Sequence, residues 1–177
     1  MASMFMRTAS SPLFLICDVE IRELLRHVIN VRVHFDAVLQ GQIQAIHLEY
    51  TDARANLAAA LRKAPPNGAV AFRAIATKWL IVVYLLLGDI PERSLFAGGG
   101  GPSASKIQAL LTPYLSLAMA VRSGDLEAFG AAAAKFHDIF VADGVAKLVV
   151  RLRRSVIRTG LRRIHLAYSR ISLADGR

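Results

Sequence analysis

The sequence has too few cysteines and too short a hydrophobic run for several classes of protein. Its single cysteine, Cys17, excludes an intramolecular disulfide framework and a cluster of thiolate metal ligands, which indicates a reducing compartment, the cytoplasm and nucleus. The most apolar run, 79–87, has nine residues, whereas a helix that spans a bilayer needs about 20. We therefore expect a buried helix segment here and no membrane partner.

Motifs for catalysis and metal binding are also missing. Histidines occur at positions 27, 34, 47, 137 and 165. None of them stands at a metal-ligand spacing with carboxylates or cysteines, and neither His-Glu-x-x-His nor Gly-x-Ser-x-Gly occurs in the sequence. We expect no enzyme activity, no catalytic residue, no metal and no cofactor.

The glycine run at 98–101 is the one segment that resembles a phosphate-binding loop. The motif requires Gly-Lys-Ser/Thr after a strand, but Lys106 lies between Ser105 and Ile107, and the preceding segment is expected to be helical. We interpret the run as a linker. An enzyme that binds a nucleotide through this loop is the alternative, which a nucleotide-binding assay would test.

What the chain has in excess is residues that favour helices. Hydrophobic residues make up 54% of the chain, against about 45–50% in an ordinary globular protein, and the surplus is largely alanine and leucine, which lose little side-chain freedom in helices. Periodicity, proline and glycine predict helices at 18–39, 40–50, 52–64, 69–87, 114–121, 128–140 and 145–168, with a turn at 49–51 and a loop at 91–105. In this interpretation Thr51 is of the N-cap type and Pro113 opens a helix.

Small residues and repeated turns predict how these helices are arranged. Gly41, Ala53, Ala60 and Pro65 have the spacing of the small and proline positions in a tetratricopeptide unit. The turn sequences Leu48-Glu49-Tyr50, Gly88-Asp89-Ile90 and Gly124-Asp125-Leu126 recur after 40 and then 36 residues. Helical hairpins that repeat in this way stack into a solenoid. The predicted fold class is therefore all-α, a tetratricopeptide-like helical-repeat solenoid.

The last expected helix carries most of the excess positive charge. Residues 140–177 contain nine basic and two acidic residues, whereas residues 1–139 are nearly balanced. At 100° per residue, five of the basic side chains lie within about 80° of one another, in line with His165. These five residues, the basic ridge, are Lys147, Arg151, Arg154, Arg158 and Arg162. Apolar residues occupy two other arcs, Val145, Val149, Leu152 and Val156 in one and Val150, Ile157, Leu161 and Ile164 in the other, so we expect packing on two sides.

The basic ridge has two interpretations. It is either a solvated face, since exposed ion pairs contribute only about 0–1 kcal/mol, or a partner-binding surface for an acidic protein chain. Arginine outnumbers lysine, which favours the second interpretation because guanidinium groups bind carboxylates in a bidentate manner. Nucleic acid is disfavoured, since no aromatic residues alternate with the arginines to stack on bases.

Four stretches of the chain resemble, in order, the helical repeats of the non-ATPase regulatory subunit 3 family of the 26S proteasome. They are LEYTDARANLAAALRKAP (48–65), KWLIVVYLLLGDIPERSLF (78–96), LLTPYLSLAMAVRSGDLEAF (110–129) and VVRLRRSVIRTGLRRIHLAYSRISLAD (149–175). The resemblance covers about 35–175 and does not extend to the first 30 residues.

This resemblance implies the helical part of a PCI domain, in which the repeats lead into a winged helix. It divides the chain into a disordered or non-family segment at 1–17, helical repeats at 18–171, and the start of a winged helix at 172–177, of which most is missing. The first segment has no acidic residue and only Arg7 as a basic one, so a targeting segment is its alternative interpretation.

The implied function is that of a non-catalytic scaffold in the lid of the regulatory particle, which supports ubiquitin-dependent protein degradation. The implied partners are other lid subunits in a hetero-oligomer, including a small, acidic, largely disordered subunit for the basic ridge. The alternative is a PCI module of another complex, such as a signalosome or a translation-initiation or mRNA-export complex, whose basic helix contacts nucleic acid.

Overall fold

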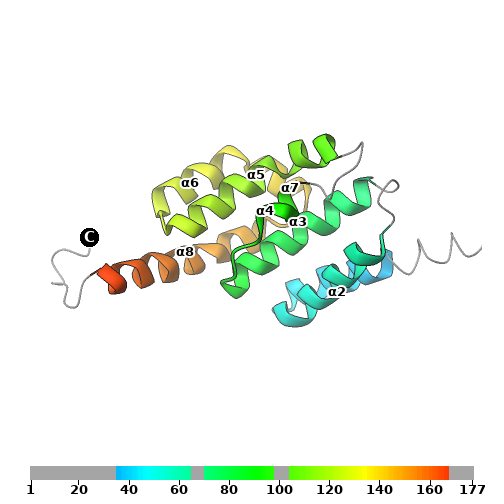
Figure 1. Ribbon diagram of the computed structural model, residues 1–177, viewed down its shortest axis with the longest axis horizontal. Coiled ribbons are helices and arrows are strands. Elements are labelled where there is room, and N and C mark those ends of the chain that lie inside the picture. The colour runs from blue at the N-terminus through cyan, green and yellow to red at the C-terminus, as the bar shows by residue number, and fades with distance from the viewer. Residues whose placement is uncertain (1–34, 65–69, 98–103, 168–177) are drawn as a thin grey trace, which may run out of the picture.

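A computed structural model describes residues 35–64, 70–97 and 104–167, and within these ranges all regular structure is helical (Figure 1). A first helical segment at 35–46 is followed by α2 (Tyr50–Lys63), α3 (Val70–Leu87), α4 (Arg93–Phe96), α5 (Ala104–Ser123), α6 (Leu126–Lys135), α7 (His137–Ala142) and α8 (Ala146–Ala167). The segments expected at 1–17 and 172–177, His27, His34, Pro65 and the glycine run at 98–101 lie outside the described residues.

The helices stack side by side in the order expected for helical repeats. In Figure 1 the segment 35–46 and α2 lie at one end of the molecule, α3 lies next to them, and α5 and α6 lie at the other end. Helix α3 contacts α2 on one side and both α5 and α8 on the other, and α5 also contacts α6 and α8. The predicted all-α solenoid is therefore confirmed.

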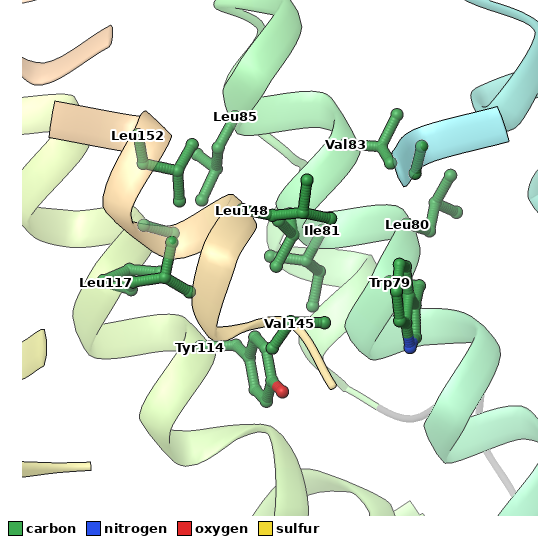
Figure 2. Close-up of a cluster of buried hydrophobic side chains, with 14 of the residues drawn as sticks. Trp79, Leu80, Ile81, Val83, Leu85, Tyr114, Leu117, Val145, Leu148 and Leu152 are labelled. Atoms are coloured by element: carbon green, nitrogen blue, oxygen red, sulfur yellow. The ribbon is translucent and has the colours of Figure 1, made fainter. Parts of the chain in front are cut away.

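Helix α3 is long and apolar enough to cross a membrane by length and composition alone, and 56% of its residues are buried inside the protein. Figure 2 shows Trp79, Ile81 and Leu85 of α3 in one cluster with side chains of α5 and α8. Because neighbouring helices cover it on several sides, the hydrophobicity of α3 is that of a core helix. The prediction that 79–87 is a buried helix segment is confirmed.

The three repeated turns share one backbone conformation. Leu48, Gly88 and Gly124 all have positive φ, at 74°, 92° and 68°. At each of them the next residue donates its N–H to a carbonyl five positions back, as in the bond from Asp125 to Ala120 at 3.3 Å, so each preceding helix ends in a Schellman motif. Asp125 then caps α6 by accepting hydrogen bonds from two backbone N–H groups at 2.9 and 3.0 Å. The repeat in the sequence is therefore a repeat of helix-ending turns.

The first hairpin is tight because its crossing residues are small. A Cβ atom added to Gly41 would lie 2.7 Å from Cγ of Leu57, and Ala53 and Ala60 have no exposed surface. The backbones of 35–46 and α2 can approach this closely only where no side chain separates them. This confirms the crossing role predicted for Gly41, Ala53 and Ala60.

Two predicted boundaries in this hairpin are wrong. The first segment continues as a helix from 35 to 46 across the boundary predicted between Leu39 and Gln40, because no residue there breaks a helix. The turn lies at 47–49 instead of 49–51, and the N-cap position of α2 belongs to Glu49 instead of Thr51. The chain reverses at Leu48, the residue with positive φ.

The prediction that Pro113 opens a helix is also wrong, because α5 runs through it from Ala104. A proline inside a helix leaves the carbonyl oxygen four residues earlier without its donor. That carbonyl belongs to Ala109, an exposed residue, where water can supply the missing hydrogen bond, while Pro113 itself is buried. The loop predicted at 91–105 is shorter than expected, since it contains α4, which is held by the buried Phe96.

The helix expected at 128–140 is divided into α6 and α7. Phe136 leaves the helical conformation, with φ −111° and ψ 20°, although neither glycine nor proline marks the site. The break orients α7 so that Phe140 packs edge-on against Tyr114, with ring centroids 5.3 Å apart. Burial of Phe140 therefore accounts for a break that local sequence signals do not predict.

Candidate protein-binding surface

The first half of α8 is packed into the core through the arc predicted for it. Val145, Val149, Leu152 and Val156 are buried, and Leu148 beside them is buried as well. Figure 2 shows Val145, Leu148 and Leu152 in the cluster formed with α3 and α5. This arc fixes the rotation of α8 and so determines which residues of the helix reach the surface.

The second apolar arc is not packed, and the prediction that α8 is covered on two sides is wrong. Val150, Ile157 and Leu161 are 74%, 41% and 60% exposed. In Figure 1 the second half of α8 extends past the end of α3, so α3 does not cover it. The apolar residues of this half therefore belong to the surface.

All five residues of the basic ridge are exposed, as predicted. From Lys147 to Arg162 the ridge extends along about 22 Å of helix at 1.5 Å per residue. None of the five side chains forms an ion pair with an acidic residue in the ranges that the structure describes.

The end of the ridge combines charge with apolar surface. A shallow depression of about 470 Å³ along α8 is lined by Arg154, Ile157, Arg158, Leu161, Arg162 and His165. Guanidinium groups that flank exposed aliphatic side chains fit a partner with carboxylates beside apolar residues. The sequence prediction grouped the charges correctly but placed the aliphatic residues inside the protein.

A buried ion pair anchors the start of α8 to α3. The Nζ atom of Lys78 donates to both carboxylate oxygens of Asp143, at 2.7 and 2.8 Å, and the hydroxyl group of Tyr114 donates to Oδ2 of Asp143 at 2.7 Å. Burial, together with the neighbouring carboxylate of Asp143, raises the pKa of the Tyr114 hydroxyl well above its ordinary value. The three side chains, here called the Lys78 clamp, join α3, α5 and the turn before α8.

Two glycines hold the exposed half of α8 against the α5–α6 turn. A Cβ atom added to Gly124 would lie 2.6 Å from the backbone of Gly160, and one added to Gly160 would lie 3.0 Å from the carbonyl oxygen of Gly124. Beside this contact, Nη1 of Arg163 donates to the carbonyl oxygen of Ser123 at 2.8 Å, at the end of α5. Neither this contact nor the Lys78 clamp could be predicted from the sequence, because both join residues far apart in the chain.

The described residues contain no group of three or more His, Cys, Asp or Glu side chains able to hold a metal ion. His47, His137 and His165 lie on different elements and do not come together. Lys106 is an exposed residue near the start of α5. Within these ranges the arrangement offers charge and apolar surface for binding.

Known proteins are similar in sequence to this chain over most of its length. Residues 31–118 match a family model described as PSMD3-like, N-terminal TPR repeats. The chain is 52% identical over 135 residues to a probable 26S proteasome non-ATPase regulatory subunit 3 of Nicotiana tabacum, which covers 76% of this chain. It is also 52% identical over 135 residues to homolog A of that subunit in Arabidopsis thaliana. It is 46% identical over 147 residues, which is 82% of this chain, to a probable 26S proteasome regulatory subunit rpn3 of Schizosaccharomyces pombe.

These alignments cover 26% of each plant protein and 28% of the yeast protein. The chain therefore spans about a quarter of the length of the curated relatives that it matches.

Proposed function

Because this chain belongs to the family of 26S proteasome non-ATPase regulatory subunit 3, we propose that it is a non-catalytic scaffold in the lid of the proteasome regulatory particle. Identity of 52% to two plant subunits over 135 residues is the observation that carries the proposal. In this role the chain supports ubiquitin-dependent protein degradation in the cytoplasm and nucleus by holding neighbouring lid subunits. It acts through surfaces that bind other subunits, which agrees with the names of relatives that are non-ATPase subunits.

The structural support for this role is the division of α8 into a packed half and an exposed half. The packed half is fixed by Val145, Leu152 and the Lys78 clamp, and the contact between Gly124 and Gly160 holds the exposed half against the α5–α6 turn. A rigid helix that presents its side chains at fixed spacing binds a partner without a large loss of conformational entropy. Scaffold proteins built from helical repeats use such surfaces.

The basic ridge is our proposed contact for an acidic lid partner, a small and largely disordered subunit. Five exposed cations with no ion-pair partner in the described residues give this face a strong positive potential. Ile157 and Leu161, which lie between the arginines, add apolar surface that a partner with alternating acidic and large apolar residues would cover. We expect the arginines to set the association rate and the salt dependence, and the apolar residues to slow dissociation.

Affinity purification of the tagged chain from cells tests the scaffold role. We expect lid subunits in the eluate, in amounts that do not change after nuclease treatment. A matched control is the variant Leu57→Asp, which places a carboxylate in the core at a fully buried position and should unfold the hairpin. Recovery of RNA without lid subunits would contradict the proposal and support a PCI module that binds nucleic acid.

A further inference from the structure

A second surface, distant in sequence from the basic ridge, forms an apolar groove of about 880 Å³ on the outer side of α5. The groove has a floor and a wall from different elements. Its floor is one stripe of α5, consisting of Gln108, Leu111, Thr112, Leu115, Ala118, Met119 and Arg122. Its wall comes from the segment before α4 and from α4 itself, with Ile90, Pro91, Arg93 and Phe96. On α8, Arg163 also lines it.

The apolar part of this groove is accessible on the surface of the described chain. Met119 is 63% exposed, Ile90 50% and Leu115 38%, whereas Leu111 of the floor and Phe96 of the wall are buried. The stripe from Gln108 to Arg122 is about 21 Å long at 1.5 Å per residue. A groove of this length accommodates about four turns of a second helix with large side chains at i, i+3, i+4 and i+7.

The charges around the groove have one sign. Arg93 of α4, Arg122 of α5 and Arg163 of α8 line it, and no aspartate or glutamate is among its lining residues. Arg163 is engaged with the carbonyl oxygen of Ser123, but Arg93 and Arg122 form no ion pair with any residue in the described ranges. A ligand with carboxylates beside its apolar face would therefore satisfy both the groove and its rim.

We propose that this groove binds an acidic amphipathic helix supplied by another protein. The occupant presents a stripe of large aliphatic or aromatic side chains to Leu115 and Met119 and places carboxylates against Arg93 and Arg122. A second copy of this chain is a poor occupant, because the chain has a net charge of +9 and would bring arginines towards arginines. The proposal does not depend on the proposed function, since the basic ridge points away from α5 on a different face of α8.

Two designed peptides test the proposal with the 177-residue chain. Both are 15-residue helices with leucine at i, i+3, i+4 and i+7. One carries glutamate beside the leucine stripe and the other carries lysine at the same positions. Fluorescence anisotropy measures the Kd of each peptide for the unaltered chain, for Met119→Glu, for Arg93→Glu/Arg122→Glu, and for Arg62→Glu on α2 as a control. All four substituted side chains are exposed, so these variants should keep the fold, which far-UV circular dichroism verifies.

We expect the glutamate peptide to bind at least ten times more tightly than the lysine peptide. Met119→Glu should weaken it at least tenfold by placing a carboxylate in the apolar stripe. The double variant should reverse the preference between the peptides, and Arg62→Glu should change the Kd less than twofold. Any of four results would overturn the proposal: no saturable binding, equal affinity for both peptides, no effect of Met119→Glu, or an equal loss in Arg62→Glu. Conversion of a dimer to a monomer by Met119→Glu, measured by light scattering, would assign the groove to a second copy instead.

Discussion

Removal of the Asp143 carboxylate should destabilise the protein more than removal of any exposed acidic residue. Asp143 accepts three hydrogen bonds, two from Lys78 and one from Tyr114. In the variant Asp143→Ala the ammonium group of Lys78, whose side chain is 10% exposed, would remain in the core without a counter-charge. The hydroxyl group of Tyr114, a residue with no exposed surface, would lose its acceptor.

The expected magnitude follows from this burial. Breaking a buried ion pair from one side costs about 3–5 kcal/mol, because the remaining charge keeps its desolvation penalty. The chain contains a matched control in the ion pair of Arg54 with Asp89, which joins α2 to the turn after α3, at 3.2 Å. Those side chains are 41% and 58% exposed, so Asp89→Ala should cost only about 0–1 kcal/mol.

Urea denaturation followed by circular dichroism at 222 nm measures both free energies of unfolding. A third variant, Lys78→Met/Asp143→Ala, removes both charges and should recover a large part of the loss, since no unpaired charge is left. If Asp143→Ala costs no more than Asp89→Ala, the clamp does not anchor α8 and the reasoning is refuted.

Three further predictions concern the turns and the clamp. Leu48→Gly should stabilise the protein by about 0.5–1 kcal/mol in the same urea assay, because it relieves a left-handed conformation at an exposed leucine; a loss of stability would contradict this. Gly124→Ala should cost about 2–4 kcal/mol, since the new Cβ would meet backbone atoms of Gly160 at 2.6 Å and the φ is positive. Gly130→Ala is the control, and it should be neutral or stabilising because a Cβ added to Gly130 has no atom within 4 Å. Above about pH 10 the unfolded chain releases the Tyr114 proton and the folded chain keeps it. The free energy of unfolding should therefore fall with rising pH, by up to about 1.4 kcal/mol per pH unit more than in Tyr114→Phe. Equal slopes of the free energy against pH in the two proteins would show that the hydroxyl is not held in its neutral form.

The turns could be predicted from sequence because their cause is local. Gly88 and Gly124 end helices through positive φ, and Asp125 after Gly124 is the N-cap of the next helix. Leu48 occupies the same conformation without being glycine, and only its place in the repeat identified it. The boundary predicted at 49–51 is wrong by about two residues, because Thr51 has the side chain of an N-cap residue but the chain reverses at Leu48.

The ends of other elements could not be predicted, since long-range packing decides them. Phe136 interrupts a helix so that Phe140 reaches Tyr114, and no signal near Phe136 indicates this. Pro113 stays inside α5 because its neighbours bury it and because the carbonyl that it leaves unbonded lies on an exposed residue. In both cases contacts made across the solenoid outweigh the local preference.

The basic ridge shows what helical periodicity alone establishes. Periodicity grouped Lys147, Arg151, Arg154, Arg158 and Arg162 on one exposed face, because the angle between residues depends only on helix geometry. It did not establish which arcs of α8 are covered by other helices. Val150, Ile157 and Leu161 are all exposed, although their spacing is that of buried residues. Which helices lie opposite α8 is a tertiary property that periodicity does not contain.

We propose that an acidic lid partner binds to the exposed half of α8, and this proposal can be tested directly. The most direct test measures the affinity of the purified chain for that small acidic subunit at several salt concentrations. The variant Arg154→Glu/Arg158→Glu is compared with Arg62→Glu/Lys63→Glu, which makes an equal change of charge at exposed residues of α2. We predict a loss of at least tenfold at low salt for the α8 variant, a shallower salt dependence, and a change below twofold for the α2 variant. Equal affinities of the two variants at low salt would contradict the claim.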